Sequence, residues 1–156
     1  MTADFVLDEN VYVRALESED TREPDDELAA LLIQCLQVRH RWVLTGEVMK
    51  SYYRQFAPYG SGRGVIATRM IASLTNVVSD SNRFLIRHAP PVIPGDYDHD
   101  DDHMVAAVAD LGPGTLLITL DVRLRNSLRS AAIPDNHHFR VIDVQEALSE
   151  LCARSE

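Results

Sequence analysis

The sequence is almost without lysine: Lys50 is the only one, and every other member of its 15 basic residues is an arginine. A phosphate-binding loop of the G-x-x-x-x-G-K-[ST] type needs a lysine before its hydroxyl residue, and Lys50 does not stand in such a loop. This excludes a P-loop nucleotide hydrolase. A response-regulator receiver is disfavoured too, because it needs a lysine late in the chain and none follows Lys50.

Long apolar runs and cysteines are also scarce. No run approaches the roughly 20 residues needed to span a bilayer, and the acidic first ten residues lack a signal peptide's basic and apolar regions. We therefore expect a cytoplasmic protein without a membrane segment. The two cysteines, Cys35 and Cys152, lie in helical patterns among apolar neighbours. We expect two buried free thiols rather than a disulfide framework.

The balance of charge is acidic, with a formal net charge of −9 over 156 residues. Non-specific nucleic-acid binders are usually basic, so this balance argues against one. Arginine nevertheless grips phosphate through paired hydrogen bonds, and local arginine clusters would still guide RNA. An acidic surface also suits a basic peptide partner. The length and the 46% hydrophobic content predict a single globular domain over residues 1–156.

The apolar pattern predicts an α/β fold in which strands and helices alternate around a mainly parallel sheet. A strand, helix and strand over residues 5–44 form a right-handed β-α-β unit. Segment 10–17 fits a short helix or an irregular turn. The expected strands are 5–7, 41–45, 83–88, 116–119 and 139–144, and the expected helices are 28–38, 45–56, 65–78, 102–109, 122–131 and 144–152.

Three aspartates stand where such a fold gathers ligands. Asp8 ends the first strand, Asp121 follows the strand after the Gly-Pro-Gly turn, and Asp102 leads a helix whose apolar face includes Val105 and Ala109. Ligands bind at the carboxyl edge of parallel strands. Clustered carboxylates repel one another, and a divalent cation such as Mg²⁺ or Mn²⁺, which serves phosphoryl chemistry, relieves that repulsion. The alternative is that each acid caps a helix or ends a turn.

These stretches resemble the motifs of PIN-domain ribonucleases. LDENVYV, from Leu7, is similar to the family's opening motif, in which the Asp binds metal and the Asn lies close by. DHMVAAVA, from Asp102, resembles the second motif, and LLITLD, ending at Asp121, resembles a strand ending in Thr-x-Asp. The order and spacing match from Asp4 to about Val144. The branch it most resembles is the VapC-like toxins of toxin–antitoxin modules.

The resemblance implies a three-layer α/β/α fold and a Mg²⁺- or Mn²⁺-dependent endoribonuclease. Asp8, Asp102 and Asp121 would bind the metal, while Asn10 and Thr119 would orient carboxylates or water. It further implies an RNA substrate, a cognate antitoxin protein and a homodimer.

The sequence departs from the family at its usual fourth acid, a glutamate on the helix after the second strand. That position falls near Lys50 or Ser51. Glu47 lies one turn before Ser51 on the same helical face, so it is the candidate replacement in the catalytic set. The alternative is an ordinary first-turn glutamate favoured by the helix dipole.

The phosphate contacts expected from the sequence are arginines that flank the glycine-rich segment 58–64. Each of them alone also fits a solvated surface position. The three are Arg54, Arg63 and Arg69.

Other chemistries fit the residues less well. His99 and His103 stand beside aspartates, yet no cysteine is near and the tetrahedral spacing of a zinc site is missing. A haloacid dehalogenase-type phosphatase needs Asp-x-Asp after the first strand, and position 10 is Asn. The main alternative is a catalytically inactive PIN-like module that binds RNA or a protein. The missing glutamate and the acidic balance favour it.

Overall fold

The computed structural model of this chain describes residues 3–11, 13–15, 24–48, 50, 54, 84–86 and 91–152. The expected helix 65–78 and the loop 58–64 lie outside these residues, as do Arg63 and Arg69. Five strands pair in parallel in the order β3-β2-β1-β4-β5, which confirms the predicted sheet. The strands are β1 (Asp4–Leu7), β2 (Arg41–Leu44), β3 (Phe84–Ile86), β4 (Thr115–Ile118) and β5 (Phe139–Ile142).

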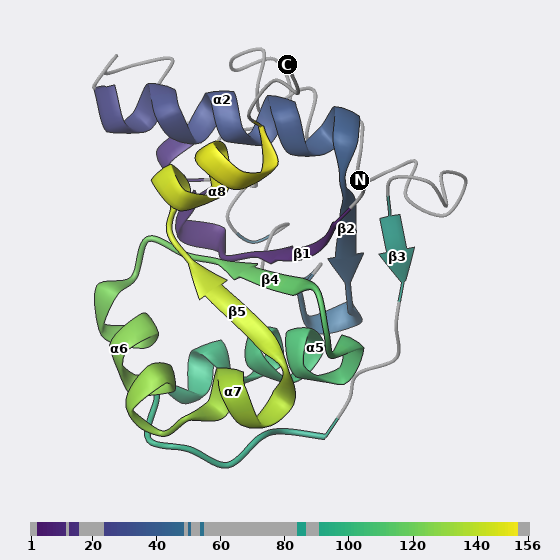
Figure 1. Ribbon diagram of the computed structural model, residues 1–156, viewed down its shortest axis with the longest axis vertical. Helices are drawn as coiled ribbons and strands as arrows, with labels where there is room; N and C mark the ends of the chain where they lie inside the picture. The colour runs from purple at the N-terminus through teal and green to yellow at the C-terminus, as the bar shows by residue number, and fades with distance from the viewer. Residues whose placement is uncertain are drawn as a thin grey trace.

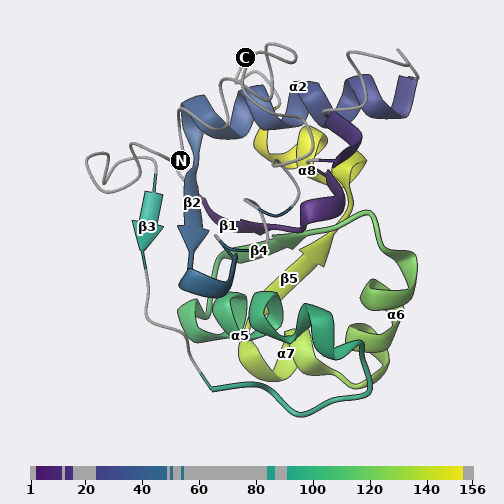
Figure 2. The ribbon, with the colours of Figure 1, turned by 180° about the vertical axis from the view of Figure 1, so that it is seen from behind.

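Helices cover both faces of the sheet, and the three-layer α/β/α arrangement is confirmed. One layer holds α2 (Pro24–Arg39) and α8 (Val144–Leu151), which pack against each other (Figure 1). The opposite layer holds α5 and α7, with α6 beside α7 (Figure 2). Their bounds are α5 (Asp102–Leu111), α6 (Val122–Ser130) and α7 (Ile133–His137), and a 3-10 turn, η3 (His99–Asp101), leads into α5. No helix in the described part of the chain is long and apolar enough to cross a bilayer.

The central strands are buried on both faces, as their uninterrupted apolar runs require. In β1, Phe5 and Leu7 are 1% exposed and Val6 is fully covered, while the ring of Phe5 stacks on Trp42 of β2 with centroids 5.8 Å apart. Each such large side chain contributes about 1.5–3 kcal/mol by leaving water. The acids after β1 therefore follow directly on a fully buried part of the core.

The Gly-Pro-Gly turn sets the point at which β4 enters the sheet. Gly112 and Gly114 have φ of 72° and 84°, values that glycine adopts without steric cost. The turn ends α5 and starts β4 at Thr115, and the register then pairs Leu7 with Ile118. The residues that follow these two strands consequently emerge side by side.

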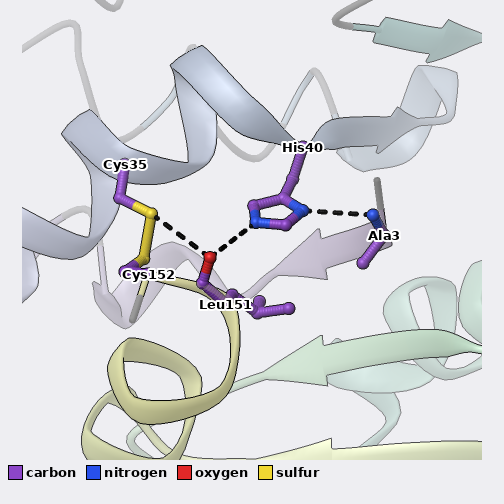
Figure 3. The surroundings of a disulfide bond; sticks show 5 residues. All are labelled: Ala3, Cys35, His40, Leu151 and Cys152. Atoms are coloured by element: carbon purple, nitrogen blue, oxygen red, sulfur yellow. Dashed lines mark hydrogen bonds between the residues drawn. A yellow bond between two sulfur atoms is a disulfide. The ribbon is translucent and has the colours of Figure 1, made fainter. Parts of the chain in front are cut away.

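The cysteines do not form the free thiols expected from the sequence. Cys35 of α2 and Cys152, just after α8, form a disulfide with Cα atoms 5.9 Å apart and 117 residues between them in sequence (Figure 3). The expectation of free thiols was wrong because it considered each helix by itself. The packing of α8 on α2 brings the two half-buried residues together.

His40 forms a second connection next to the disulfide (Figure 3). Its Nδ1 accepts the Ala3 backbone N–H at 3.1 Å, so its Nε2 carries the proton and donates to the Leu151 carbonyl at 2.9 Å. The ring thus ties the start of β1 and the end of α8 to the end of α2. Both ring nitrogens of His40 are therefore used in holding the fold together.

Candidate active site

Asp8 is the buried carboxylate of the site. It follows β1 directly, is 4% exposed, and donates its backbone N–H to the Ile118 carbonyl at 2.9 Å. Thr119, the matching residue after β4, is fully buried and donates its hydroxyl to Asp8 Oδ2 at 2.6 Å. A hydrogen bond from a hydroxyl to a carboxylate is strong in so dry a place. The sheet register therefore fixes the orientation of this carboxylate.

Asn10 supports the same pair from the helical residues after β1. Its backbone N–H points to Asp8 Oδ1 at 3.4 Å, and its Nδ2 points to Thr119 Oγ1 at 3.4 Å. Its Oδ1 accepts the Leu120 backbone N–H at 3.3 Å. Asn10 and Thr119 thus make the contacts that a supporting role for Asp8 requires. A role in catalysis stays a prediction for both.

Asp121 stands at the start of α6 and does two things there. Its Oδ1 accepts the Leu124 backbone N–H at 3.1 Å, which caps the helix, and its own N–H is bonded to Thr119 Oγ1 at 3.0 Å. Arg125 donates to the carbonyl of Thr119, two residues before Asp121, at 2.8 Å. The capping interpretation of Asp121 is therefore correct, and its second carboxylate oxygen still remains for a ligand.

Electrostatic coupling singles out Asp101, not Asp102, at the head of α5. Burial, followed by the charges of Asp8 and Asp121, raises the pKa of Asp101 to about 7. The charge of Asp102 acts instead on Tyr97 and His103. Asp101 is the N-cap residue of α5, yet its side chain makes no capping hydrogen bond and stays available to the site. The sequence analysis correctly began the helix at Asp102 and did not consider Asp101, the residue just before it. Metal binding by Asp102 stays a prediction.

The pKa of two further acids, Asp8 and Glu9, is also raised. Burial raises the pKa of Asp8, and the charge of Asp121 adds to the rise, against the Thr119 and Asn10 hydrogen bonds that lower it. Burial and then Asp8 raise the pKa of Glu9, while Arg54 lowers it. Arg54, which was predicted from the sequence to contact phosphate, is therefore close enough for its charge to act on Glu9 at this edge. Glu9 was overlooked although it adjoins Asp8 in sequence.

A pocket of about 370 Å³ opens beside these acids. Its walls come from the segment before α5, from the head of α5 and from the first turns of α6. Four of its residues are aspartates and one is an arginine. The lining residues are Asp96, Tyr97, Asp98, Asp101, Asp121, Arg123, Leu124 and Ser127.

Glu47 lies on the helical segment after β2, whose first turn is capped by Thr45: the Thr45 hydroxyl accepts the Val48 N–H at 3.2 Å. The Glu47 side chain is 59% exposed and forms an ion pair with Lys50 at 3.3 Å. Burial lowers the pKa of His103, and the charges of Asp102, Asp8 and Glu47 act to raise it. The charges of Glu47 and Asp8 therefore both act on His103. The catalytic role of Glu47 stays a prediction.

The donor set of the edge fits a hard divalent cation. Carboxylate oxygens are the ligands that Mg²⁺ and Mn²⁺ prefer. Burial raises the pKa of Asp101, and the negative charges of Asp8 and Asp121 add to the rise. Within the described residues, no three histidine, cysteine, aspartate or glutamate side chains stand close enough to enclose an ion. A cation would therefore have to draw Asp8, Asp101 and Asp121 together as it binds.

Comparison with known proteins supports the fold. No protein-family model matches the sequence, and no curated protein matches it. A PilT N-terminus domain protein from the hyperthermophilic archaeon Sulfolobus solfataricus P2 has a similar solved structure, with a TM-score of 0.51 and 13% sequence identity. The match covers 98% of this chain and 97% of that one. The chain therefore has the PilT N-terminus (PIN) domain fold that its motifs predict.

Proposed function

We propose that this protein is a PIN-domain nuclease that cleaves RNA phosphodiester bonds with a bound Mg²⁺ or Mn²⁺ ion. One observation carries the proposal: Asp101 is half-buried at the carboxyl edge of the sheet within reach of the charges of Asp8 and Asp121, and burial together with these charges raises its pKa to about 7. A fold that only needed caps would gain nothing from uniting three carboxylates against their repulsion. The clustering is the arrangement expected of a site for a divalent cation.

The chain's own residues have separable tasks in this proposal. When bound, the metal supplies a hydroxide at neutral pH and stabilises charge on the scissile phosphate. Thr119 and Asn10 hold Asp8 in one orientation, and the capping bond to Leu124 holds Asp121. Fixed ligands keep the geometry of such a site and support its affinity.

Cleavage of a labelled single-stranded RNA in Mn²⁺ tests the proposal. Asp8→Asn, Asp101→Asn and Asp121→Asn should each abolish cleavage, and EDTA should abolish that of the wild type. Asp135→Asn is the matched control, because it removes the same charge from an exposed position on α7. Cleavage by any of the first three variants at the wild-type rate would remove that residue from the metal site.

Comparing variants of Asp101 and Asp102 shows which of these two neighbouring acids binds the metal. Asp101→Asn and Asp102→Asn remove the same charge one residue apart. If the coupling to Asp8 and Asp121 identifies the ligand, Asp101→Asn is the damaging change. Loss of activity only in Asp102→Asn would instead support the motif alignment.

The alternative function is a catalytically inactive PIN-like module that binds RNA or a protein. The observation that favours it is that the family's fourth acid is expected near Lys50 or Ser51, neither of which is an acid, and that Lys50 pairs with Glu47 at 3.3 Å. An inactive module would bind RNA or a basic protein and leave labelled RNA intact at every Mn²⁺ concentration.

The proposal also includes the VapC-like toxin class, the homodimer and the antitoxin partner that the motifs suggest. A VapC-like toxin would be a cytoplasmic homodimer inhibited by a cognate antitoxin. Expression of the chain should then arrest growth, and co-expression of a small protein from the neighbouring reading frame should relieve the arrest. Light scattering at the monomer mass would exclude the homodimer.

A further inference from the structure

A groove continues from the acidic pocket along the outer face of α6. A second pocket, of about 740 Å³, adjoins the first and shares Asp96, Arg123 and Ser127 with it. Its remaining walls are Val122, Asn126, Ser130 and Ala131. Positions 123, 126, 127 and 130 recur at helical spacing, so one face of α6 forms the wall of this groove.

The two ends of the groove differ in chemistry. The end at the sheet edge has four aspartates. The end along α6 shares only Asp96 of these and has hydroxyl and amide side chains with one large exposed apolar residue, Val122, at 57% exposure. Arg123 stands where the two ends meet. Among the described residues, it is the one basic side chain that lines either pocket.

Arg123 is also the arginine of α6 that the fold leaves unused. Arg125 donates to the Thr119 carbonyl at 2.8 Å, and Arg129 donates to the Val141 carbonyl at 2.8 Å. These two arginines hold the helix against the ends of β4 and β5. Arg123 has no hydrogen bond or ion pair within the described part of the chain, and its side chain is exposed. Its five donors are therefore free for a ligand.

We propose that the groove along α6 binds the RNA backbone next to the cleaved bond, and that Arg123 grips its adjacent phosphate. This inference rests on the proposed nuclease function and names its substrate-binding residue. The guanidinium matches a phosphate with two parallel hydrogen bonds. Asn126, Ser127 and Ser130 add donors along the strand, and Val122 offers an apolar contact to a ribose or base.

The charge of the site explains why one arginine there matters. RNA is a polyanion, and four aspartates line the pocket that would receive its cleaved bond. A cation at the acids neutralises one end only. Arg123 supplies attraction at the point where the strand passes from the acids to α6, so it sets the register of the backbone without reading bases.

Binding of a fluorescein-labelled single-stranded RNA, measured by anisotropy in EDTA from 50 to 300 mM KCl, tests this inference. Arg123→Ala should weaken binding about five- to ten-fold at 100 mM KCl. The slope of log K against log salt should fall by about 0.7, the value for one phosphate contact on a single strand. Arg123→Lys should keep the slope and lose part of the affinity, because it keeps the charge without the fork.

Arg39→Ala is the matched control, since Arg39 is exposed at the end of α2, at the opposite edge of the sheet. Its affinity and slope should equal those of the wild type. In Mn²⁺, Arg123→Ala should raise KM more than it lowers kcat, with an unchanged thermal midpoint.

If Arg123→Ala still binds and cleaves RNA with unchanged affinity and salt slope, the groove is not the RNA-binding site. The proposed nuclease function would be unaffected by that result. An equal loss in Arg39→Ala would also overturn it, because the effect would be one of net charge. A wild type that neither binds RNA in EDTA nor cleaves it in Mn²⁺ would overturn both proposals together.

Discussion

Thr119 donates its hydroxyl proton to Asp8 across 111 residues of sequence, at 2.6 Å between the oxygens. The same hydroxyl oxygen accepts the Asp121 backbone N–H at 3.0 Å. One side chain therefore joins the first and the last acid of the site. The contact exists because β1 and β4 are parallel neighbours that end at the same level.

Replacing Thr119 by valine should weaken Mn²⁺ binding about ten- to a hundred-fold, as is usual when the support of a ligand is lost. The Thr119 hydrogen bond lowers the pKa of Asp8, so its removal should raise that pKa further. Isothermal titration with Mn²⁺ and a carboxylate NMR titration would measure both effects. Thr119→Ser keeps the hydroxyl and serves as the control; equal binding by the valine variant would show that Asp8 needs no such support.

Stability without metal should depend on pH through Asp101. Its folded pKa, about 7, lies above the ordinary 3.8, so the folded state favours the protonated acid. Its contribution to stability is complete below about pH 4 and is lost as pH rises through 7. Asp101→Asn should therefore be more stable than the wild type at pH 8, by about 1–3 kcal/mol allowing for solvent screening.

Urea unfolding in EDTA at pH 4, 6 and 8 would measure this difference, with Asp102→Asn as the neighbour that loses the same charge. A gap between the Asp101 variant and the wild type that stays constant from pH 4 to pH 8 would contradict the coupling. Because Asp8 and Glu9 are coupled to the same field, the transition belongs to the group of acids.

Glu47→Gln separates a catalytic glutamate from a surface one. The pair with Lys50 is exposed on both sides, so its loss should change stability by less than about 0.5 kcal/mol. If Glu47 replaces the missing family acid, cleavage should slow about ten-fold or more, or Mn²⁺ binding should weaken. Lys50→Gln breaks the same pair while keeping the acid and is the control. Wild-type cleavage by Glu47→Gln would reject the replacement.

Reduction of the disulfide should destabilise the fold. Cys35 and Cys152 close a loop of 117 residues, and a link of this length typically contributes about 2–4 kcal/mol by restricting the unfolded chain. Urea unfolding with and without a thiol reductant would measure the loss. Cys35→Ser with Cys152→Ser should show the lower stability and no response to reductant. A reductant effect of equal size in that double variant would place the cause elsewhere.

The candidate site shows where sequence reasoning was sufficient and where it was not. Asp8 and Asp121 could be chosen from the sequence because each directly follows an apolar strand, and parallel strands end at a common edge. Asp101 could not be told from Asp102, since both stand in a run of aspartates before the same helix. The difference lies in the surroundings that the fold gives Asp101, which is half-buried and within reach of the charges of Asp8 and Asp121.

The three-layer arrangement was expected from the resemblance to PIN domains. By itself the sequence determined the parallel sheet, the glycine turn and the places of Asp8 and Asp121 after their strands. These follow from local patterns: apolar runs, helix starts and turn residues act over a few positions. Only the tertiary structure decided the disulfide, the link of Thr119 to Asp8 and the free position of Arg123. Each of these depends on how distant elements pack, because contacts between residues far apart in the chain are set by the register of the sheet and the docking of the helices.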